Sequence, residues 1–325
     1  MLAPVTTPPG TLESPPGSTA GAGGPAVPGR PRRSSVRARR EATMGYLLLA
    51  PSLIGIVAFL LLPILVVLWL SLNQWDLLAP MRFVGLDNWV SVLSQPVFGR
   101  SLLVTIVFVL MVIPIQTTLG LFMATLLSRG LPGSSVFRVI FVIPWICAPL
   151  ALGIVWKWIF APYGGALNTL LGTHIEWLSN PSLALPAVAT VSIWSQVGYT
   201  TLFFMAGLAA IPEQVLVAAQ LDGASAWQTF VRIKLPLLLP TMFFVLVTGV
   251  ISSFQAFDHI YALTPNGGPQ GATDVIATRI YLEAFQGGFN LGNASVMALV
   301  LFAILVVITI IQQRWFSRRV TYDLS

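Results

Sequence analysis

The chain has 325 residues and a formal net charge of +6; 56% of its residues are hydrophobic and only 9% are charged. Soluble domains carry about 25% charged residues, and a soluble fold of this size cannot hide so much apolar surface from water. Together with a mean hydropathy of +0.83, this composition excludes most soluble enzyme classes and predicts an integral membrane protein.

Residues 1–44 are rich in Pro, Gly, Ser and Ala and lack apolar periodicity, so we expect a disordered cytoplasmic tail. A signal peptide is the competing interpretation, but the apolar stretch that follows is too long for one. Met44 directly precedes that stretch and would serve as an alternative start, leaving residues 1–43 outside the native chain. The basic residues of the tail are typical of an anchor beside anionic lipid and argue against nucleic-acid binding. They are Arg30, Arg32, Arg33, Arg37, Arg39 and Arg40.

Six apolar runs follow the tail, each long enough to cross a hydrocarbon core of about 30 Å. No charged residue falls in the middle of a run, and several runs contain proline, so we expect kinked helices packed in a bundle. The sequence thus predicts an all-α membrane domain over 45–315, followed by a short cytoplasmic tail, 316–325. The runs lie near 46–72, 102–128, 137–160, 184–208, 236–257 and 292–313.

The distribution of Lys and Arg predicts the orientation. If both termini are cytoplasmic, only four of the 17 basic residues fall in segments on the outer side, namely Arg82, Arg100, Lys157 and Arg279. Cytoplasmic loops carry an excess of basic residues, so this arrangement is favoured. An even number of spans agrees with it.

The chain lacks the motifs that would supply energy or catalysis. Neither of its two lysines, Lys157 and Lys234, stands in a Walker A loop, so we expect no ATP hydrolysis by this chain. No ionisable residue lies at mid-membrane depth to serve an ion-coupled carrier. One cysteine, Cys147, and two distant histidines, His174 and His259, leave no disulfide and no metal site. Energy must come from a partner, or the protein is a passive pore.

The cytoplasmic loop 211–234, between the fourth and fifth spans, predicts two short helices at the membrane surface. Pro212 suits a helix start, and Asp222-Gly223 suits a break in which the glycine is left-handed. Ala226, Phe230 and Ile233 then share one face at helical spacing. On these grounds alone, a simple amphipathic connector is an equally good interpretation.

The residue string of this loop resembles the coupling loop of ABC importer permeases. That pattern is Glu-Ala-Ala, three residues, Gly, nine residues, and Ile-x-Leu-Pro. The family's glutamate is replaced here by Val217, and Glu213 lies one helical turn earlier, where it is a candidate substitute. In the family that glutamate contacts the ATPase subunit, so the resemblance implies that this contact is absent here or supplied by another residue. The matching residues are Ala218, Ala219, Gly223, Ile233, Leu235 and Pro236, with Asp222-Gly223-Ala224 matching the longer form of sugar permeases.

The resemblance extends from about residue 46 to the C-terminus. It implies the six-helix bundle of type I ABC importer permeases, in the maltose and glycerol-phosphate group, with glycerol-3-phosphate or glycerophosphodiester permeases as the nearest in overall likeness. The supporting segments are 83–89 (FVGLDNW), 144–149 (PWICAP), 163–168 (YGGALN), 177–178 (WL), 264–269 (TPNGGP) and 322–324 (YDL).

The resemblance also implies partners. We expect a second, homologous permease subunit, two ATPase subunits that bind ATP and magnesium, and an extracytoplasmic solute-binding protein that delivers a small solute. The chain itself would be a transport subunit without cofactor or enzymatic activity, in a bacterial inner membrane. Permeation of another carbohydrate such as a disaccharide stays open. A passive channel or scaffold explains the spans but not the loop, and the loop type argues against an exporter.

Polar side chains inside two apolar spans mark a candidate substrate pathway, because such groups are costly in lipid unless they find partners. Helix–helix hydrogen bonding is the alternative. We expect His174 and His259 to face water at loops or helix ends. The pathway candidates are Ser192, Trp194, Gln196 and Tyr199 in the fourth span, and Ser253, Gln255 and Asp258 at the end of the fifth.

Overall fold

The computed structural model describes residues 35–130 and 132–317, which fall into two units, Met1–Phe59 and Leu60–Ser325. In the first unit, helix α1 spans Ser35–Ile56. The expected disorder of residues 35–44 is therefore not what the structure has: these residues are helical, since Arg, Ala, Glu and Met are good helix formers. The rest of the predicted tail, residues 1–34, lies outside the described residues.

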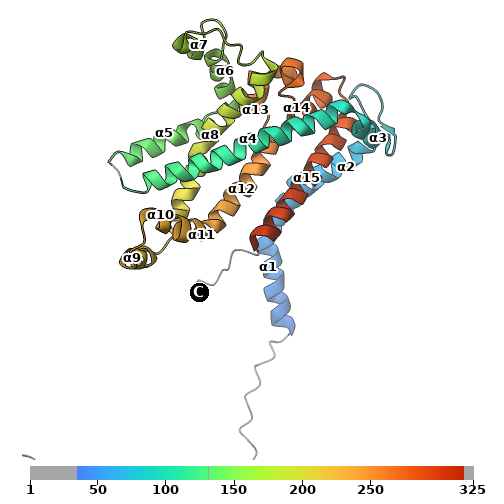
Figure 1. The fold of residues 1–325 in the computed structure, drawn as a ribbon. Helices are drawn as coiled ribbons and strands as arrows, with labels where there is room; N and C mark the ends of the chain where they lie inside the picture. Colours follow the sequence, from blue (N-terminus) through green and yellow to red (C-terminus); the bar gives the residue numbers. More distant parts are fainter. Residues whose placement is uncertain (1–34, 131, 318–325) are drawn as a thin grey trace, which may run out of the picture. The chain divides into compact units, whose positions relative to one another are not determined.

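The prediction of an all-α membrane bundle is confirmed (Figure 1). Among the described residues, four helical segments are long and apolar enough to span a membrane, and two bent helix pairs bring the number to as many as six. Strand structure in this part of the chain is limited to the antiparallel pair β1 (Asn73–Gln74) and β2 (Arg82–Phe83). The four segments are Arg39–Ser71, Pro96–Leu127, Leu239–Leu263 and Leu291–Ser317.

The third predicted span, 137–160, is wrong as a single helix. The chain forms α5 (Ser134–Ile146) and α6 (Pro149–Ile159), whose axes bend by 100°. Pro149 restricts the residue before it to extended backbone, and Ala148 accordingly has ψ 122° while Cys147 has ψ 148°. The break therefore follows from the local sequence around Pro149.

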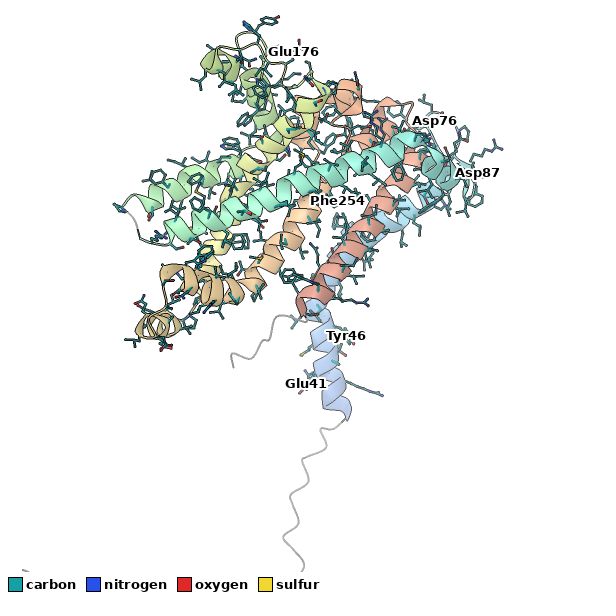
Figure 2. The ribbon with its side chains drawn as sticks, viewed as in Figure 1. Glu41, Tyr46, Asp76, Asp87, Glu176 and Phe254 are labelled. Atoms are coloured by element: carbon teal, nitrogen blue, oxygen red, sulfur yellow. The ribbon has the colours of Figure 1, made fainter. Side chains whose placement is uncertain are left out.

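The core of the second unit is built on α4 (Pro96–Leu127) and α8 (Pro181–Ala209), which pack along each other. A hypothetical Cβ on Gly120 would lie 2.5 Å from the Thr200 side chain, and one on Gly198 would lie 1.8 Å from the Phe141 carbonyl oxygen of α5. Small residues thus let these helices approach closely, as is usual in membranes. Phe254 of α12 (Leu239–Phe254), labelled in Figure 2, is buried in an apolar cluster that also includes Val109 of α4 and Met297 of α15 (Leu291–Ser317).

Short elements gather at the two ends of the bundle (Figure 1). One end carries α9 (Glu213–Leu221), α10 (Ala226–Thr229), the π-helical turn η2 (Phe230–Lys234) and α11 (Leu235–Leu237), before α12 (Leu239–Phe254). The other end carries α3 (Asp87–Ser94), α7 (Ala166–Leu171), α13 (Asp258–Leu263), η3 (Pro265–Gly267), η4 (Pro269–Gly271), α14 (Ile276–Tyr281) and η5 (Leu282–Gln286). The remaining helical segments are η1 (Val57–Leu61), α2 (Leu62–Ser71) and α15 (Leu291–Ser317). Of the expected C-terminal tail, residues 318–325 lie outside the described range.

Two motifs of the sequence analysis prove to be loop braces. Asn88 is buried, and its Nδ2 donates to the carbonyl oxygens of Ser71 (3.0 Å) and Asn73 (2.9 Å). Asn168 Nδ2 donates to Ile175 O (2.8 Å), while Asn168 Oδ1 accepts from Trp177 Nε1 (2.9 Å). Each asparagine thus satisfies buried backbone groups that have no helical partner.

Another loop at this end of the bundle holds a carboxylate at its turn. The Asp76 carboxylate accepts hydrogen bonds from the backbone N–H groups of Ala79 (2.8 Å) and Leu78 (3.1 Å). These donors hold the pKa of the Asp76 carboxyl below its ordinary value, because they favour the charged form. Asp76 and Asp87 both lie at the end of the bundle that carries α3, and Glu176 lies at the end that carries α6 and α7 (Figure 2).

Candidate functional site

The loop 211–234 has the two-helix structure that the sequence predicts. Gly223 has φ +75° and ends α9, with Gly223 N–H bonded to Gln220 O (3.0 Å) and Ala224 N–H bonded to Ala219 O (2.9 Å). The left-handed conformation is readily available only to glycine, so this residue sets the turn between α9 and α10. Pro212 stands directly before the first residue of α9, one position earlier than expected.

The second helix of this loop starts with a capping box. Ser225 Oγ accepts from Gln228 N–H (3.3 Å), and Gln228 Oε1 accepts from Ser225 N–H (2.8 Å). The Trp227 and Phe230 rings stack with centroids 6.0 Å apart. The hydrogen bonds satisfy backbone donors at the start of α10 and thereby fix where this helix begins.

Apolar side chains of α9 and α10 face outward. Leu221 is 84% exposed, Trp227 is 72% exposed and Val217 is 45% exposed. Glu213, Val217 and Leu221 are four residues apart along α9, so they share one helix face. Of the other predicted residues, Ala218, Asp222 and Pro236 are exposed, Ala224 is half-buried, and Ala219 is buried. The surface formed by Val217, Leu221 and Trp227, with Glu213 at its edge, is called the coupling surface below.

Six of the seven predicted pathway residues line one cavity of about 170 Å³ between α4, α8, α12 and α13. Its lining also includes Gln116, whose Nε2 donates to Thr200 Oγ1 (2.8 Å), a cross-helix bond that the sequence analysis did not anticipate. Asp258 is the one Asp, Glu, Lys or Arg residue among the lining residues. The predicted residues in this lining are Ser192, Gln196, Tyr199, Ser253, Gln255 and Asp258.

Trp194, the seventh predicted pathway residue, lies outside this lining. Its ring packs edge-on against Trp156 of α6, with centroids 5.3 Å apart and an interplanar angle of 71°. Trp194 is two positions from Ser192 and two from Gln196. Each step of two positions turns about 200° around a helix, so Trp194 lies on the opposite face of α8. Tyr199 does face the cavity, where its ring packs against Trp145 (4.8 Å) and Phe203 (4.7 Å).

His259 is a further cavity residue that the sequence analysis missed. It was expected to face water at a helix end, but it is partly buried and lines the cavity, with Nε2 2.5 Å from Ser192 Oγ. Ser192 Oγ also donates to Val188 O (3.1 Å), so both contacts are satisfied together when His259 Nε2–H is the donor. The predicted fifth span stopped at residue 257. After a break at Phe257, the helical path continues to Leu263 and carries His259 inward.

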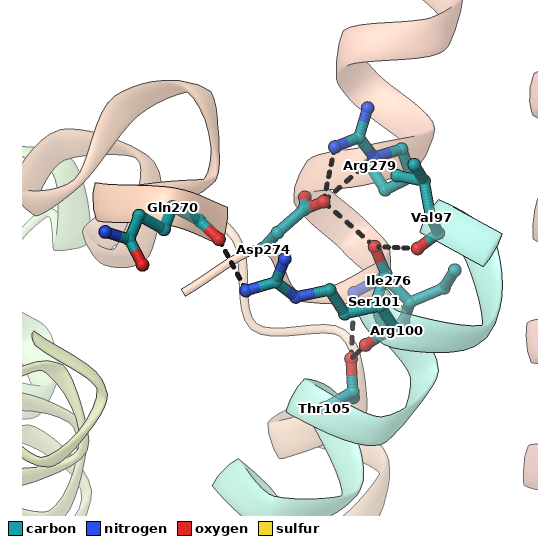
Figure 3. Close-up of polar contacts among 8 residues, drawn as sticks. All are labelled: Val97, Arg100, Ser101, Thr105, Gln270, Asp274, Ile276 and Arg279. Atoms are coloured by element: carbon teal, nitrogen blue, oxygen red, sulfur yellow. Dashed lines mark hydrogen bonds and ion pairs between the residues drawn. The ribbon is translucent and has the colours of Figure 1, made fainter. Parts of the chain in front are cut away.

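A second polar cluster fastens the segment 264–279 to the start of α4 (Figure 3). The buried Asp274 Oδ2 accepts from Ser101 Oγ (3.0 Å) and Arg279 Nε (3.0 Å), and it forms an ion pair with Arg279 Nη2. Thr105 Oγ1 accepts from Ile276 N–H (2.8 Å), and Arg100 donates to the Gln270 carbonyl. These bonds fix an irregular segment in which Gln270 has φ +53°. The cluster is a brace at the end of the bundle opposite the coupling surface.

Comparison with known proteins identifies this arrangement. Residues 116–322 match the family "Binding-protein-dependent transport system inner membrane component". This stretch includes all of α8, the whole loop 211–234 and nearly all of the cavity lining. The chain belongs to this family. The resemblance seen in the sequence is confirmed, and the permease is a transport subunit rather than an enzyme.

Relatives of the permease match it over most of its length. The trehalose/maltose transport system permease protein of Thermococcus litoralis is 34% identical over 277 residues, which is 84% of this chain and 93% of that protein. The sn-glycerol-3-phosphate transport system permease protein of Agrobacterium fabrum is 35% identical over 282 residues, or 85% of this chain and 96% of the relative. Sugar and glycerol-phosphate permeases are thus similar to this chain to the same degree.

Solved structures show the same fold. A bacterial ABC transporter involved in import of the acidic polysaccharide alginate matches with a TM-score of 0.74 and 22% identity, over 88% of this chain and 99% of that one. A second structure, of the alginate transporter in complex with a periplasmic protein bound to an alginate pentasaccharide, matches with a TM-score of 0.73 and 22% identity, over 87% of this chain and 97% of the other. The expected type I importer bundle is therefore confirmed.

Proposed function

We propose that the permease forms half of the translocation pathway of an ATP-driven importer whose solute is an uncharged carbohydrate. The observation that supports this choice is the chemistry of the cavity. Its polar lining consists of hydroxyl, amide and imidazole groups and one carboxylate, that of Asp258, all of which can bond sugar hydroxyls, and it contains neither Lys nor Arg.

The same lining disfavours glycerol-3-phosphate and glycerophosphodiesters, the solutes suggested by overall likeness in the sequence analysis. A phosphate that leaves bulk water needs cationic partners, for which Arg and Lys are the usual residues. The charged residue in this lining is instead Asp258, a carboxylate that would repel the phosphate. A disaccharide, as named for the trehalose/maltose relative, suits the lining better.

We further propose that two ATPase subunits, which bind ATP and magnesium, drive transport through α9 and α10. Exposed Leu221, Trp227 and Val217 offer an apolar docking surface, and Glu213 lies on the same face of α9 as Val217. A capped loop transmits movement to the bundle better than a mobile one. A second permease subunit would complete the pathway by alternating access, with both termini in the cytoplasm.

An extracytoplasmic binding protein would deliver the solute, at the end of the bundle that carries α7, α13 and α14. Support comes from the family's dependence on binding proteins and from the alginate transporter solved with its periplasmic protein. The predicted orientation agrees, because it places α9 and α10 in the cytoplasm and these elements outside.

Co-purification with the products of neighbouring genes tests this proposal. We expect an ATPase and a second permease to stay bound in mild detergent, and ATP hydrolysis to rise when a binding protein loaded with maltose or trehalose is added. Stimulation by a binding protein loaded with sn-glycerol-3-phosphate instead would overturn the assignment of an uncharged solute. Failure to retain any ATPase would overturn the importer and favour a passive channel or scaffold.

A further inference from the structure

We infer that four aromatic side chains form a sugar-binding track that leads from the α14 end of the bundle to the central cavity. The track consists of Phe257, Tyr261, Tyr281 and Phe285, and its ligand would be the faces of pyranose rings. This inference rests on the proposed function and goes beyond it, because it adds a binding site outside the cavity.

The rings are in continuous contact. Phe257 lies 5.2 Å from Tyr261 and 4.9 Å from Tyr281, while Tyr261 lies 5.2 Å from Tyr281, and Phe285 lies 5.4 Å from Tyr281, all between ring centroids. Phe257 belongs to the cavity lining, and Phe285 at the other end is 53% exposed. The row therefore has one end in the cavity and the other at the surface.

Local structure explains how these residues meet. Phe257 directly precedes α13 and Tyr261 follows one helical turn later, so both lie on one side of that helix. Tyr281 ends α14, and the π-helical turn η5 carries Phe285 onward. π-helical turns are rare and are frequent at functional sites.

These rings are not core residues. None of the four belongs to the three clusters of buried apolar side chains or to the partly buried residues packed against them. Phe257, Tyr261 and Tyr281 are only partly buried. Tyr261 Oη accepts from Gln286 Nε2 (2.8 Å), so hydrogen-bonding groups lie beside the ring faces.

The chemistry matches a neutral sugar. A pyranose ring has a face of C–H groups, which carry partial positive charge and pack on the negative face of an aromatic ring, and a rim of hydroxyl groups. The Tyr261 hydroxyl and the Gln286 amide can bond that rim. The nearby Glu283 carboxylate is occupied, since it accepts from Asn290 Nδ2 and Asn293 Nδ2, both at 3.3 Å.

Site-specific fluorotyrosine in the full transporter complex tests the track by direct contact. The label is placed at Tyr281 or Tyr261, with Tyr163 as the control because it is 79% exposed and lies between α6 and α7, away from the track. We expect maltose or trehalose at high millimolar concentration to shift the fluorine resonance at residues 281 and 261 but not at 163. sn-Glycerol-3-phosphate, which has no pyranose face, should shift none of them.

Variants supply a second readout. Tyr281→Leu should lower the sugar-stimulated transport rate several-fold, whereas Tyr281→Phe, which keeps the ring, should retain it. The control Tyr46→Leu, at an exposed position of α1, should also retain it. No resonance shift at 281 and 261 with either disaccharide, or equal transport by Tyr281→Leu and Tyr281→Phe at the wild-type rate, would overturn the track. Normal sugar-stimulated ATP hydrolysis in the same samples would show that the proposed function survives. Burial of the labels by the second permease, seen as loss of access to a soluble paramagnetic probe, would also overturn it.

Discussion

His259 Nε2 lies 2.5 Å from Ser192 Oγ and thereby joins α13 to α8 at the wall of the central cavity. The bond thus links the two sides of the loop 211–234. Helix α8 leads into this loop at α9, and α12, which starts after the loop, leads on to α13. This contact therefore couples the positions of α8 and α13 during alternating access.

Removing this bond should destabilise the permease modestly. In Ser192→Ala the imidazole loses its partner, and we expect a loss of about 1 kcal/mol in the free energy of unfolding. Ser195→Ala is the matched control, because Ser195 Oγ bonds only to Ser192 O of its own helix (3.0 Å). Thermal unfolding in detergent measures both. In a double-mutant cycle with His259→Ala, additive effects would contradict the coupling.

Gly198 should not tolerate a side chain. In Gly198→Ala, the added Cβ would lie 1.8 Å from Phe141 O, so α5 and α8 must separate beside Tyr199. We expect a loss of more than about 2 kcal/mol or failure to fold, in the range of overpacked cores. Gly99→Ala in α4 meets nothing within 4 Å and should be neutral or stabilising by about 0.5–1 kcal/mol. Equal melting temperatures for the two variants would disprove the close approach.

The turn of the loop 211–234 should be indispensable for transport. Gly223→Pro cannot adopt φ +75°, because proline is fixed near −65°, and Ala219→Glu places a charge at a buried position. We expect both variants to insert in the membrane but to lose solute uptake. Gln220→Glu, which adds the same charge at an exposed position of α9, should transport normally. Wild-type uptake by the first two variants would rule out force transmission through this turn.

Restoring the family glutamate should strengthen the ATPase interface. Val217 occupies that position, on the same face of α9 as Glu213. If Glu213 replaces the missing acidic group, Glu213→Gln should weaken co-purification of the ATPase, and Val217→Glu in the same chain should recover it. Retention of the ATPase by Glu213→Gln alone would show that the apolar residues of the coupling surface suffice.

The brace at the start of α4 should depend on charge balance. Arg279→Met leaves the Asp274 carboxylate buried without its cation, and breaking such a pair costs about 3–5 kcal/mol. The double variant Arg279→Met with Asp274→Asn should recover much of that loss in a thermal unfolding assay. Arg82→Met, at an exposed position of the short strand β2, is the control and should change stability little. A double variant as unstable as Arg279→Met would contradict the role of charge.

Much of the fold and part of the site could be predicted from local sequence. Glycine after Asp222 predicts the left-handed turn that Gly223 adopts, because few other residues reach that conformation. Polar residues spaced along the fourth span predict a lined cavity, since they are costly in lipid. Pro149 predicts a kink in the third span but not the size of the bend, because the sequence does not show how far two half-helices diverge.

The missed residues share a different cause. His259 follows an apparent span end at Phe257, and only tertiary packing of α13 against α6 and α8 carries it into the cavity wall. The polar indole of Trp194 predicts a place in the pathway, yet its position on α8 brings its ring into contact with Trp156. Which face of an apolar helix meets a cavity is set by its neighbours, and a hydrophobic run carries little periodic signal.

The orientation remains a prediction that the chain's cysteine content makes simple to test. Cys147→Ser removes the single native thiol, and cysteines can then be placed at exposed Ser225, in the turn before α10, or at exposed Tyr163, between α6 and α7. Because Lys and Arg gather on the side of α9 and α10, we expect a membrane-impermeant maleimide to label residue 163 in intact cells and residue 225 only after lysis. Labelling of 225 in intact cells would reverse the orientation and place the coupling surface where no cytoplasmic ATPase can reach it.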